Sequence, residues 1–255
     1  MSLLALVDAD IVTFQAAAAN ETTVTFDEGE GCLVADPDLA YFHCQDRIRD
    51  IKEKTGATHI LMVFSGSNNF RYDALRTYKH NRKGKQKPTL LAPLRARLEA
   101  EMDCQSTPRL EADDLLGIIQ STSEAPTIIC TIDKDLDQIA GPHYNWKNDS
   151  VYEVTERDAL WFSWIQVLTG DATDGYKGIP RVGPAKATKI LEPHRDDSIS
   201  LERQKAIYNR VCWEAYEEKD IYWDAYVAQV AVAQILQGDQ YDSKNNKVIT
   251  HHRTY

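Results

Sequence analysis

The sequence predicts an α/β fold in which a mostly parallel sheet carries helices on both faces. Three short apolar runs, at residues 3–7, 58–64 and 127–132, are continuous rather than alternating and rich in β-branched residues. Such runs are typical of strands that are buried on both faces of a parallel sheet. Stretches with apolar residues at helical spacing separate them, and this strand–helix–strand order predicts right-handed crossovers.

Three helices and two hairpins are expected in the first part of the chain. The helices lie at residues 39–54, 90–102 and 113–120. The first hairpin is predicted by the alternation of residues 22–26 before an acidic, glycine-containing turn at 27–31. The second joins residues 144–146 to 151–154 across a Lys-Asn-Asp turn.

The character of the sequence changes after residue 154. Thr155 and Asp158 predict the start of a helix that runs to about residue 169. A stretch rich in Gly and Pro follows, and further helices are expected at about 184–191 and within 201–237. We therefore expect an α/β domain over residues 1–154 and a helical region over residues 155–255.

Composition excludes several classes of protein. Hydrophobic residues make up 43% of the 255 residues, which argues against a disordered chain. No apolar run is long enough to cross a membrane, and the N-terminus lacks the basic start of a signal peptide. The five cysteines form no C-x-x-C pair, so a reducing cytoplasm is expected rather than a disulfide framework. The net charge of −10 would argue against a nucleic-acid partner, but the charges are sorted along the chain.

Acidic residues gather at the points where predicted strands and helices begin or end. Because ligands of open α/β sheets bind beyond the carboxyl ends of the strands, these acids are expected to share one rim. The set is Asp8, Glu111, Asp113, Asp114, Asp133, Asp135, Asp171 and Asp174. Packed alone they would repel one another, whereas oxygen ligands without His or Cys select Mg²⁺ or Mn²⁺. Two such ions about 3.5–4 Å apart can clamp a phosphodiester. Taken singly, each acid is equally explained by a turn or a helix dipole.

A strongly basic segment follows the second predicted strand. Seven bases stand against the single acid Asp73 between residues 71 and 87: Arg71, Arg76, Lys79, Arg82, Lys83, Lys85 and Lys87. Such a strip binds phosphates with a salt-dependent affinity, and the interleaved aromatic residues can stack on bases. On a helix, Lys79 and Arg82 would both point at one phosphate. The alternative is a solvated loop, since Gly84 and Pro88 interrupt regular structure.

The segment from Gly178 to Gly183 has the pattern of the hairpin in a helix-hairpin-helix motif. The whole motif would extend over about residues 165–191. Glycines there allow backbone N–H groups to approach phosphates at a helix N-terminus. Lys186 and Lys189 add positive charge on the helix that follows. It is not a P-loop, because no Gly-Lys-Ser/Thr follows at the required spacing. An ordinary turn with a helix cap is the alternative.

Taken in order, these motifs resemble the flap endonuclease and 5′→3′ exonuclease superfamily. The chain is most similar to the short exonucleases of T-odd phages and to the 5′-nuclease domain of bacterial DNA polymerase I. The likeness spans residues 3 to about 191. It rests on Val7-Asp8-Ala9-Asp10, Phe70-Arg71, Tyr78-Lys79-His80-Asn81-Arg82, Glu111-Ala112-Asp113-Asp114, Asp133-Lys134-Asp135, Gly170-Asp171-Ala172-Thr173-Asp174-Gly175 and Gly178-Ile179-Pro180-Arg181-Val182-Gly183.

The resemblance implies a PIN-like, resolvase-like fold with a helical arch at about residues 70–100. It implies two Mg²⁺ or Mn²⁺ ions. The first would be held by Asp8, Glu111 and Asp113, and the second by Asp133, Asp135, Asp171 and Asp174, with Asp114 acting through water. Lys79 and Arg82 would act on the scissile phosphate, and Tyr78 would stack on the terminal base. The glycine loop would hold duplex DNA and a K⁺ ion.

The function expected from this resemblance is metal-dependent 5′→3′ hydrolysis of duplex DNA with 5′ ends or flaps, including removal of RNA primers from RNA–DNA hybrids. The catalytic set is Asp8, Lys79, Arg82, Glu111, Asp113, Asp133, Asp135 and Asp174. The DNA-binding set is Arg71, Arg76, Tyr78, Lys79, Arg82, Lys83, Gly178, Gly183, Lys186 and Lys189. A monomer without membrane association, acting in the host cytoplasm, is expected.

One position departs from the family pattern. Many members carry an Asp directly after the second strand, where this chain has Ser65 and Gly66. Either Asp10 supplies the missing charge or a water fills the place. Two other functions stay open. One is a PIN-type single-strand ribonuclease, against which the glycine loop and basic segment argue. The other is a catalytically weak protein that binds branched DNA, which only the Ser65 departure supports.

Overall fold

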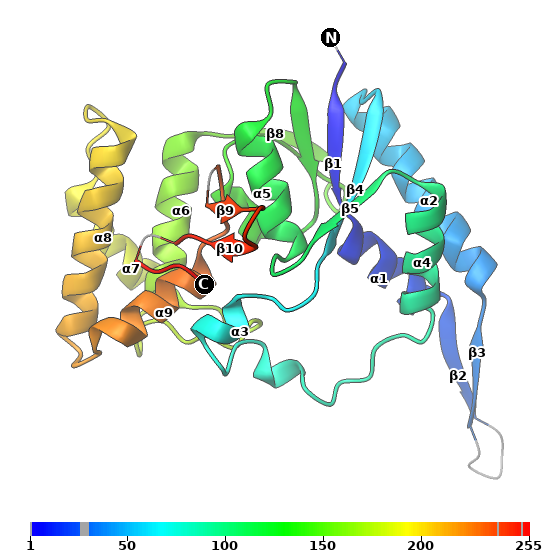
Figure 1. Ribbon diagram of the computed structural model, residues 1–255, viewed down its shortest axis with the longest axis horizontal. Coiled ribbons are helices and arrows are strands. Elements are labelled where there is room, and N and C mark those ends of the chain that lie inside the picture. Colours follow the sequence, from blue (N-terminus) through cyan, green and yellow to red (C-terminus); the bar gives the residue numbers. More distant parts are fainter. Residues whose placement is uncertain (1, 26–30, 239, 251) are drawn as a thin grey trace.

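The computed structural model describes residues 2–25, 31–238, 240–250 and 252–255, and within them a six-stranded sheet forms the centre of the α/β part (Figure 1). Its strand order is β5-β4-β1-β6-β7-β8, and every neighbouring pair is parallel except β7 and β8. The strands are β1 (Leu4–Asp8), β4 (His59–Ser65), β5 (Cys104–Thr107), β6 (Thr127–Cys130), β7 (Gly141–Asn145) and β8 (Ser150–Val154). The predicted mostly parallel sheet is therefore confirmed.

Helices cover both faces of this sheet, as predicted, because its central strands are apolar on both sides. Ala5 and Val7 of β1 pack into one core with helices α1 (Ala9–Ala19), α2 (Pro37–Thr55) and α4 (Leu91–Glu101). Leu6, which points to the other face, packs with α5 (Ala112–Thr122). The sequence did not indicate α1, which starts directly after β1, where the Asp8 carboxylate accepts a hydrogen bond from the backbone N–H of Ile11 at 3.2 Å.

Both expected hairpins are present. The first pairs β2 (Glu21–Thr25) with β3 (Gly31–Ala35) as a separate antiparallel ribbon. Residues 27–30 of its expected turn lie outside the described residues. The second pairs β7 with β8 and closes one edge of the main sheet.

The arch expected at residues 70–100 differs from the prediction in its middle. Helix α3 (Arg71–Ala74) and the 3₁₀ helix η1 (His80–Arg82) are short, and residues 83–90 contain no helix before α4 begins. The arch is thus largely a loop, which runs across the bottom of Figure 1 between α3 and α4. Gly84 and Pro88 explain this, because both disfavour helix interiors.

The region after residue 154 contains α6 (Glu156–Thr169), α7 (Pro184–Leu191), α8 (Leu201–Glu217) and α9 (Trp223–Ala233). Thr155 caps α6 as expected, and its side chain accepts a hydrogen bond from the N–H of Asp158 at 3.1 Å. These helices share a core built around Trp164 and Tyr226.

The end of the chain adds two short strands to the helices expected after residue 154. After α9 it forms the short strands β9 (Tyr241–Asp242) and β10 (Lys247–Val248), and Val248 packs with Phe70 and Leu110. The last residues therefore return to the α/β part. No helix within the described residues is long and apolar enough to span a membrane.

Candidate metal centre and nucleic-acid interface

The acidic residues meet where β1 and β6 end and where α5 and η2 begin. Asp8 ends β1 and is buried, and Thr131 beyond β6 donates its hydroxyl to the Asp8 carboxylate at 3.0 Å. Asp133 precedes the 3₁₀ helix η2 (Lys134–Gln138) and accepts a hydrogen bond from the N–H of Asp135 at 2.9 Å. Glu111 precedes α5, so its carboxylate lies at the positive end of that helix.

The electrostatics show that these carboxylates act on one another. Burial, followed by the charges of Asp10 and Asp133, raises the pKa of Asp8 to about 7. Burial and the neighbouring Asp8 and Asp133 raise the pKa of Asp113 well above its ordinary value. The pKa of Asp135 also rises to about 7, through burial and then through Asp133 and Asp171. The structure thus gathers acids from four separate parts of the sequence, and a divalent cation is the species that relieves such repulsion.

The donor set fits a hard divalent cation, although the side chains do not converge as they stand. Within the described part of the chain, no group of three Asp, Glu, His or Cys side chains is arranged to hold an ion. Asp135 nevertheless has a buried Oδ1 with no hydrogen-bond partner, and its nearest cation is Lys134 Nζ at 3.9 Å. A buried, unpartnered carboxylate oxygen is costly, and an ion would satisfy it.

Two arch cations pair with two of these acids, Glu111 and Asp174. Lys79 pairs with Glu111 and lies 3.5 Å from Asp174 (Nζ to Oδ2), and Arg82 pairs with Asp174. Burial would lower the pKa of Lys79, but Glu111 and Asp174 raise it above its ordinary value. Burial would likewise raise the pKa of Glu111, but Lys79 and Arg71 hold it below its ordinary value. Both groups are therefore charged, and an ion that bound Glu111 or Asp174 would displace these cations.

Lys79 and Arg82 reach the acids by a different route from the one expected. They do not share a helix, because Lys79 has a left-handed backbone (φ 51°) immediately before η1. The N–H of Lys79 donates to the backbone oxygen of Asp174 at 2.7 Å, which fixes the arch to the loop after α6. The loop therefore presents both cations to the carboxylates, and no helical face is needed.

Three expected roles do not agree with the placement of their residues. Arg71 and Asp114 are only 2% and 0% exposed and form a buried ion pair, so Arg71 does not face DNA and Asp114 does not face an ion. Tyr78 is 2% exposed, and its hydroxyl donates to Glu111 at 2.8 Å and to Asp174 at 2.9 Å. Its ring stacks on Tyr176, so it is not free to stack on a base.

The departure after β4 has a structural explanation. Ser65, the last residue of β4, is one of the two positions at which the resemblance implies an acid, and its hydroxyl accepts a hydrogen bond from the N–H of Ala112 at 3.0 Å. Asp10 accepts a hydrogen bond from the N–H of Ser65 at 3.0 Å, so a carboxylate does lie beside this position. Gly66 cannot be replaced, because a Cβ there would lie 1.8 Å from the backbone oxygen of Thr107.

The glycine loop joins α6 to α7. Gly178 has a left-handed backbone (φ 57°), and a Cβ on it would lie 2.4 Å from the backbone nitrogen of Gly170. Gly183 precedes α7, and nothing lies within 4 Å of the place where its Cβ would be. Lys186 and Lys189 are exposed on the same helix. An open backbone at the N-terminus of α7, with Lys186 in its first turn, can receive a phosphate, and Lys189 adds positive charge in the last turn.

The exposed cations of the arch form a second basic surface. Arg76, Lys83, Lys85 and Lys87 are all exposed. A crevice of about 680 Å³ lies elsewhere, between η2, α6 and the segment after α9, and contains none of the clustered acids. Its lining also contains none of the basic residues of the arch or of α7, so both basic surfaces lie outside this crevice.

Sequence reasoning missed two residues that shape the centre. Thr131 donates its hydroxyl to Asp8, and Gln138 is a buried side chain at the end of η2. Thr131 lies two residues before Asp133, and only this nearness could have indicated it. Nothing in the sequence pairs Arg71 with Asp114, which lies 43 positions away.

Comparisons with known proteins agree with this geometry. The family model for the 5′-3′ exonuclease, N-terminal resolvase-like domain, matches residues 3–162. The exodeoxyribonuclease of Enterobacteria phage T3 and the exonuclease of Escherichia phage T7 are each 31% identical over 199 residues. Each match covers 74% of this chain and 66% of the relative, so the chain spans just under two thirds of their length.

A DNA polymerase I from Rhizobium leguminosarum is 32% identical over 168 residues, which are 59% of this chain and 16% of that protein. Among solved structures, the bacteriophage T5 D15 flap endonuclease, in a complex with DNA and metal ions, superposes with a TM-score of 0.63. The match covers 91% of this chain and 89% of the other at 14% identity, which establishes a shared fold.

Proposed function

Because the chain belongs to the 5′-3′ exonuclease family, through the N-terminal resolvase-like domain matched at residues 3–162, we propose that it is a metal-dependent nuclease that degrades duplex DNA from 5′ ends. The observation that carries this proposal is the cluster of mutually repelling carboxylates faced by Lys79 and Arg82. Acids alone would suit many cation-binding proteins. Acids together with cations suit a phosphodiester, whose charge must be neutralised as it reacts.

Two groups of residues would hold two Mg²⁺ or Mn²⁺ ions. Asp8, Glu111 and Asp113 form one group, and Asp133, Asp135, Asp171 and Asp174 form the other. Bound ions would supply an activated water and neutralise phosphate charge. Lys79 and Arg82 would leave Glu111 and Asp174 and bind the oxygens of the scissile phosphate. Asp114 is omitted as a ligand, because Arg71 engages its carboxylate.

Duplex DNA would contact the two basic surfaces. The exposed arch residues Arg76, Lys83, Lys85 and Lys87 would hold the strand near its 5′ end. The backbone at Gly183, with Lys186 and Lys189, would hold a phosphate of the duplex. Backbone oxygens of the glycine loop would hold a K⁺ ion. The solved flap endonuclease with DNA supports flaps as further substrates. RNA–DNA hybrids are proposed for the same site, and the chain is proposed to act as a monomer.

End-labelled substrates test this function. We expect short 5′-labelled products from a duplex labelled at its 5′ end, with the 3′-labelled strand shortening gradually. Release of the 3′ label before the 5′ label would contradict the 5′→3′ polarity. Cleavage of single-stranded RNA without cleavage of the duplex would instead identify a PIN-type ribonuclease.

Ser65 favours a second candidate function, in which the chain binds branched DNA and cleaves it poorly. Asp10 beside Ser65 argues against this candidate, since it leaves a carboxylate close to the vacant position. A 5′-flap duplex that is bound but left uncut in both Mg²⁺ and Mn²⁺ would support it.

A further inference from the structure

The segment that ends α9 and follows it is held along its backbone by three buried side chains. Residues 232–236 offer five consecutive backbone groups to these side chains, which belong to Arg71, Asp114 and Gln138. Arg71 donates to the oxygens of Val232 (3.2 Å) and Gln234 (3.0 Å), and Gln138 donates to the oxygen of Ala233 (2.9 Å). The N–H of Ile235 donates to Gln138 (3.1 Å), and that of Leu236 donates to Asp114 (3.1 Å). We call these three side chains and residues 232–236 the brace.

The Arg71–Asp114 half of the brace uses all of its hydrogen-bonding capacity. The five N–H groups of Arg71 bond to two backbone oxygens, to both oxygens of Asp114 and to Glu111 Oε2 at 3.3 Å. Asp114 also accepts from the N–H of Glu111 at 3.2 Å and from that of Leu236. This half therefore fixes the start of α5 and the carboxylate of Glu111, because a buried network with every group paired has few alternative arrangements.

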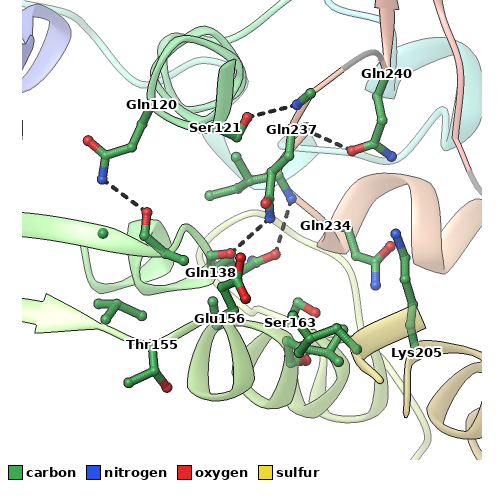
Figure 2. A pocket seen from close by; sticks show the side chains of 18 of the residues that line it. Gln120, Ser121, Gln138, Thr155, Glu156, Ser163, Lys205, Gln234, Gln237 and Gln240 are labelled. Atoms are coloured by element: carbon green, nitrogen blue, oxygen red, sulfur yellow. Dashed lines mark hydrogen bonds between the residues drawn. The ribbon is translucent and has the colours of Figure 1, made fainter. Parts of the chain in front are cut away.

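Gln138 forms the other half, at the end of η2. Figure 2 shows its side chain among those of Gln237, Gln234 and Ser163, below the segment that follows α9. Its backbone oxygen also accepts from the side-chain amide of Gln237 at 3.0 Å. Because η2 begins directly after Asp133 and contains Asp135, Gln138 attaches these acids to the same stretch of chain that holds Arg71 and Asp114.

We infer that the brace positions the two groups of acids relative to each other, so that Arg71, Asp114 and Gln138 are positioning residues for a two-ion centre. The inference rests on the proposed function. Two ions that act on one phosphate must lie about 3.5–4 Å apart, so their carriers need a fixed separation. Glu111 immediately precedes α5, which contains Asp113, and Asp133 immediately precedes η2, which contains Asp135. Residues 232–236 bond to Asp114 of α5 and to Gln138 of η2. The inference gives a role to a segment outside residues 3–162.

Mn²⁺ binding by the full chain tests this role without relying on cleavage. Free Mn²⁺ is measured by electron paramagnetic resonance, and thermal unfolding is recorded for each variant. Gln138→Met removes the amide and leaves no unpaired charge. Arg71→Lys keeps the positive charge but removes the planar guanidinium group that bonds to both oxygens of Asp114. We expect both to weaken binding of at least one Mn²⁺ by about 10–100-fold while remaining folded, the usual effect of losing a residue that orients a ligand.

Gln120→Met is the matched control. Gln120 is also an amide that donates to backbone oxygens, those of Ala140 and Pro142, and its other hydrogen bond is to Thr127, outside residues 232–236. Unchanged Mn²⁺ affinity is expected for it. Loss of affinity in proportion to the unfolded fraction, or equal loss in the control, would reduce the brace to a stabilising role and overturn the inference.

The outcomes separate this inference from the function on which it rests. Wild-type affinity in folded Gln138→Met and Arg71→Lys, with cleavage intact, would refute the brace and leave the nuclease standing. If the variants bind Mn²⁺ more weakly but the wild type itself cuts no DNA, the brace is supported and the nuclease is refuted. A wild-type chain that binds no Mn²⁺ would refute both.

Discussion

Lys79 combines a positive charge, a left-handed backbone and a position beside two carboxylates. The left-handed backbone of Lys79, directly before η1, places its ammonium group between Glu111 and Asp174. The proposed ions would replace this ammonium group as the partner of the two carboxylates. Its charge would then be available to the scissile phosphate.

We expect Lys79→Met to lower single-turnover cleavage by about 10²–10³-fold, the usual effect of removing one group that stabilises charge in the transition state. Duplex affinity, measured by fluorescence anisotropy in chelator, should change little. Lys219→Met is the control, because Lys219 is an exposed lysine outside both basic surfaces, and it should retain near-normal cleavage. A rate equal to that of the control would contradict the role of Lys79.

The raised pKa values predict how stability depends on pH and on metal. Asp8 and Asp135 have folded-state pKa values of about 7 against an ordinary 3.8. Between these values the folded chain holds more protons than the unfolded chain, so the free energy of unfolding falls as pH rises from about 4 to about 7. Ions bind the ionised carboxylates, so Mg²⁺ should raise the thermal midpoint more at about pH 8 than at about pH 5.

Differential scanning fluorimetry with Mg²⁺ or chelator at both pH values measures this effect. Asp135→Asn should reduce both the fall in stability with pH and the gain from Mg²⁺. An equal Mg²⁺ gain at the two pH values would show that these carboxylates are not the binding groups.

At the residue scale, spacing alone indicated which acids could gather at the sheet edge, because strand ends and helix starts have fixed places in an α/β fold. It could not separate ligands from structural acids. Asp113 and Asp114 are adjacent in sequence, yet one faces other carboxylates and the other faces Arg71. That difference depends on a partner 43 positions away, which periodicity does not report.

The glycine loop is the element whose two functions can be separated. Gly178 lies against the backbone of Gly170, whereas Gly183 faces open space. The first position is therefore constrained by folding, and the second only by whatever approaches α7 from outside.

Gly178→Ala should lower the free energy of unfolding by more than about 1–2 kcal/mol, because it adds a side chain to a left-handed residue with no room for a Cβ. Gly183→Ala should change stability by less than about 0.5 kcal/mol. It should nevertheless weaken duplex binding about tenfold, because the added methyl group would keep a phosphate away from the backbone N–H groups. A tenfold loss is the effect of losing one hydrogen bond to a charged phosphate. Urea unfolding and anisotropy measure the two effects. Unchanged DNA affinity in folded Gly183→Ala would show that the duplex does not approach α7.

At the element scale, the sequence predicted what long or continuous patterns specify. β1, β4 and β6 were identifiable because their apolar runs are uninterrupted, and α6 because Thr155 caps it. β5 is four residues long and partly polar, and β9 and β10 have two residues each, too few for a period to be visible. The arch was expected to be helical from the resemblance, but the Gly84–Pro88 stretch forms a loop.

At the scale of the whole molecule, an acidic chain carries cations on two surfaces, which we propose face DNA. The net charge is −10, yet the exposed arch and the start of α7 are basic. Only a minority of the 39 Asp and Glu residues lie at the centre, where the proposed ions would reverse their effect on the phosphate. The segment after α9 connects the helical part back to α5 and η2, so the two parts of the chain share one centre.

Metal-dependent cleavage of a duplex labelled at its 5′ end tests the central claim most directly. Wild-type chain, Asp133→Asn and Asp137→Asn are compared in Mg²⁺, in Mn²⁺ and in chelator. Asp137 is the matched control, because it lies on the same η2 but accepts a hydrogen bond from Tyr152. We expect short 5′ products from the wild type and from Asp137→Asn in either metal, and none from Asp133→Asn or in chelator. Cleavage that persists in chelator, or that survives in Asp133→Asn, would contradict it.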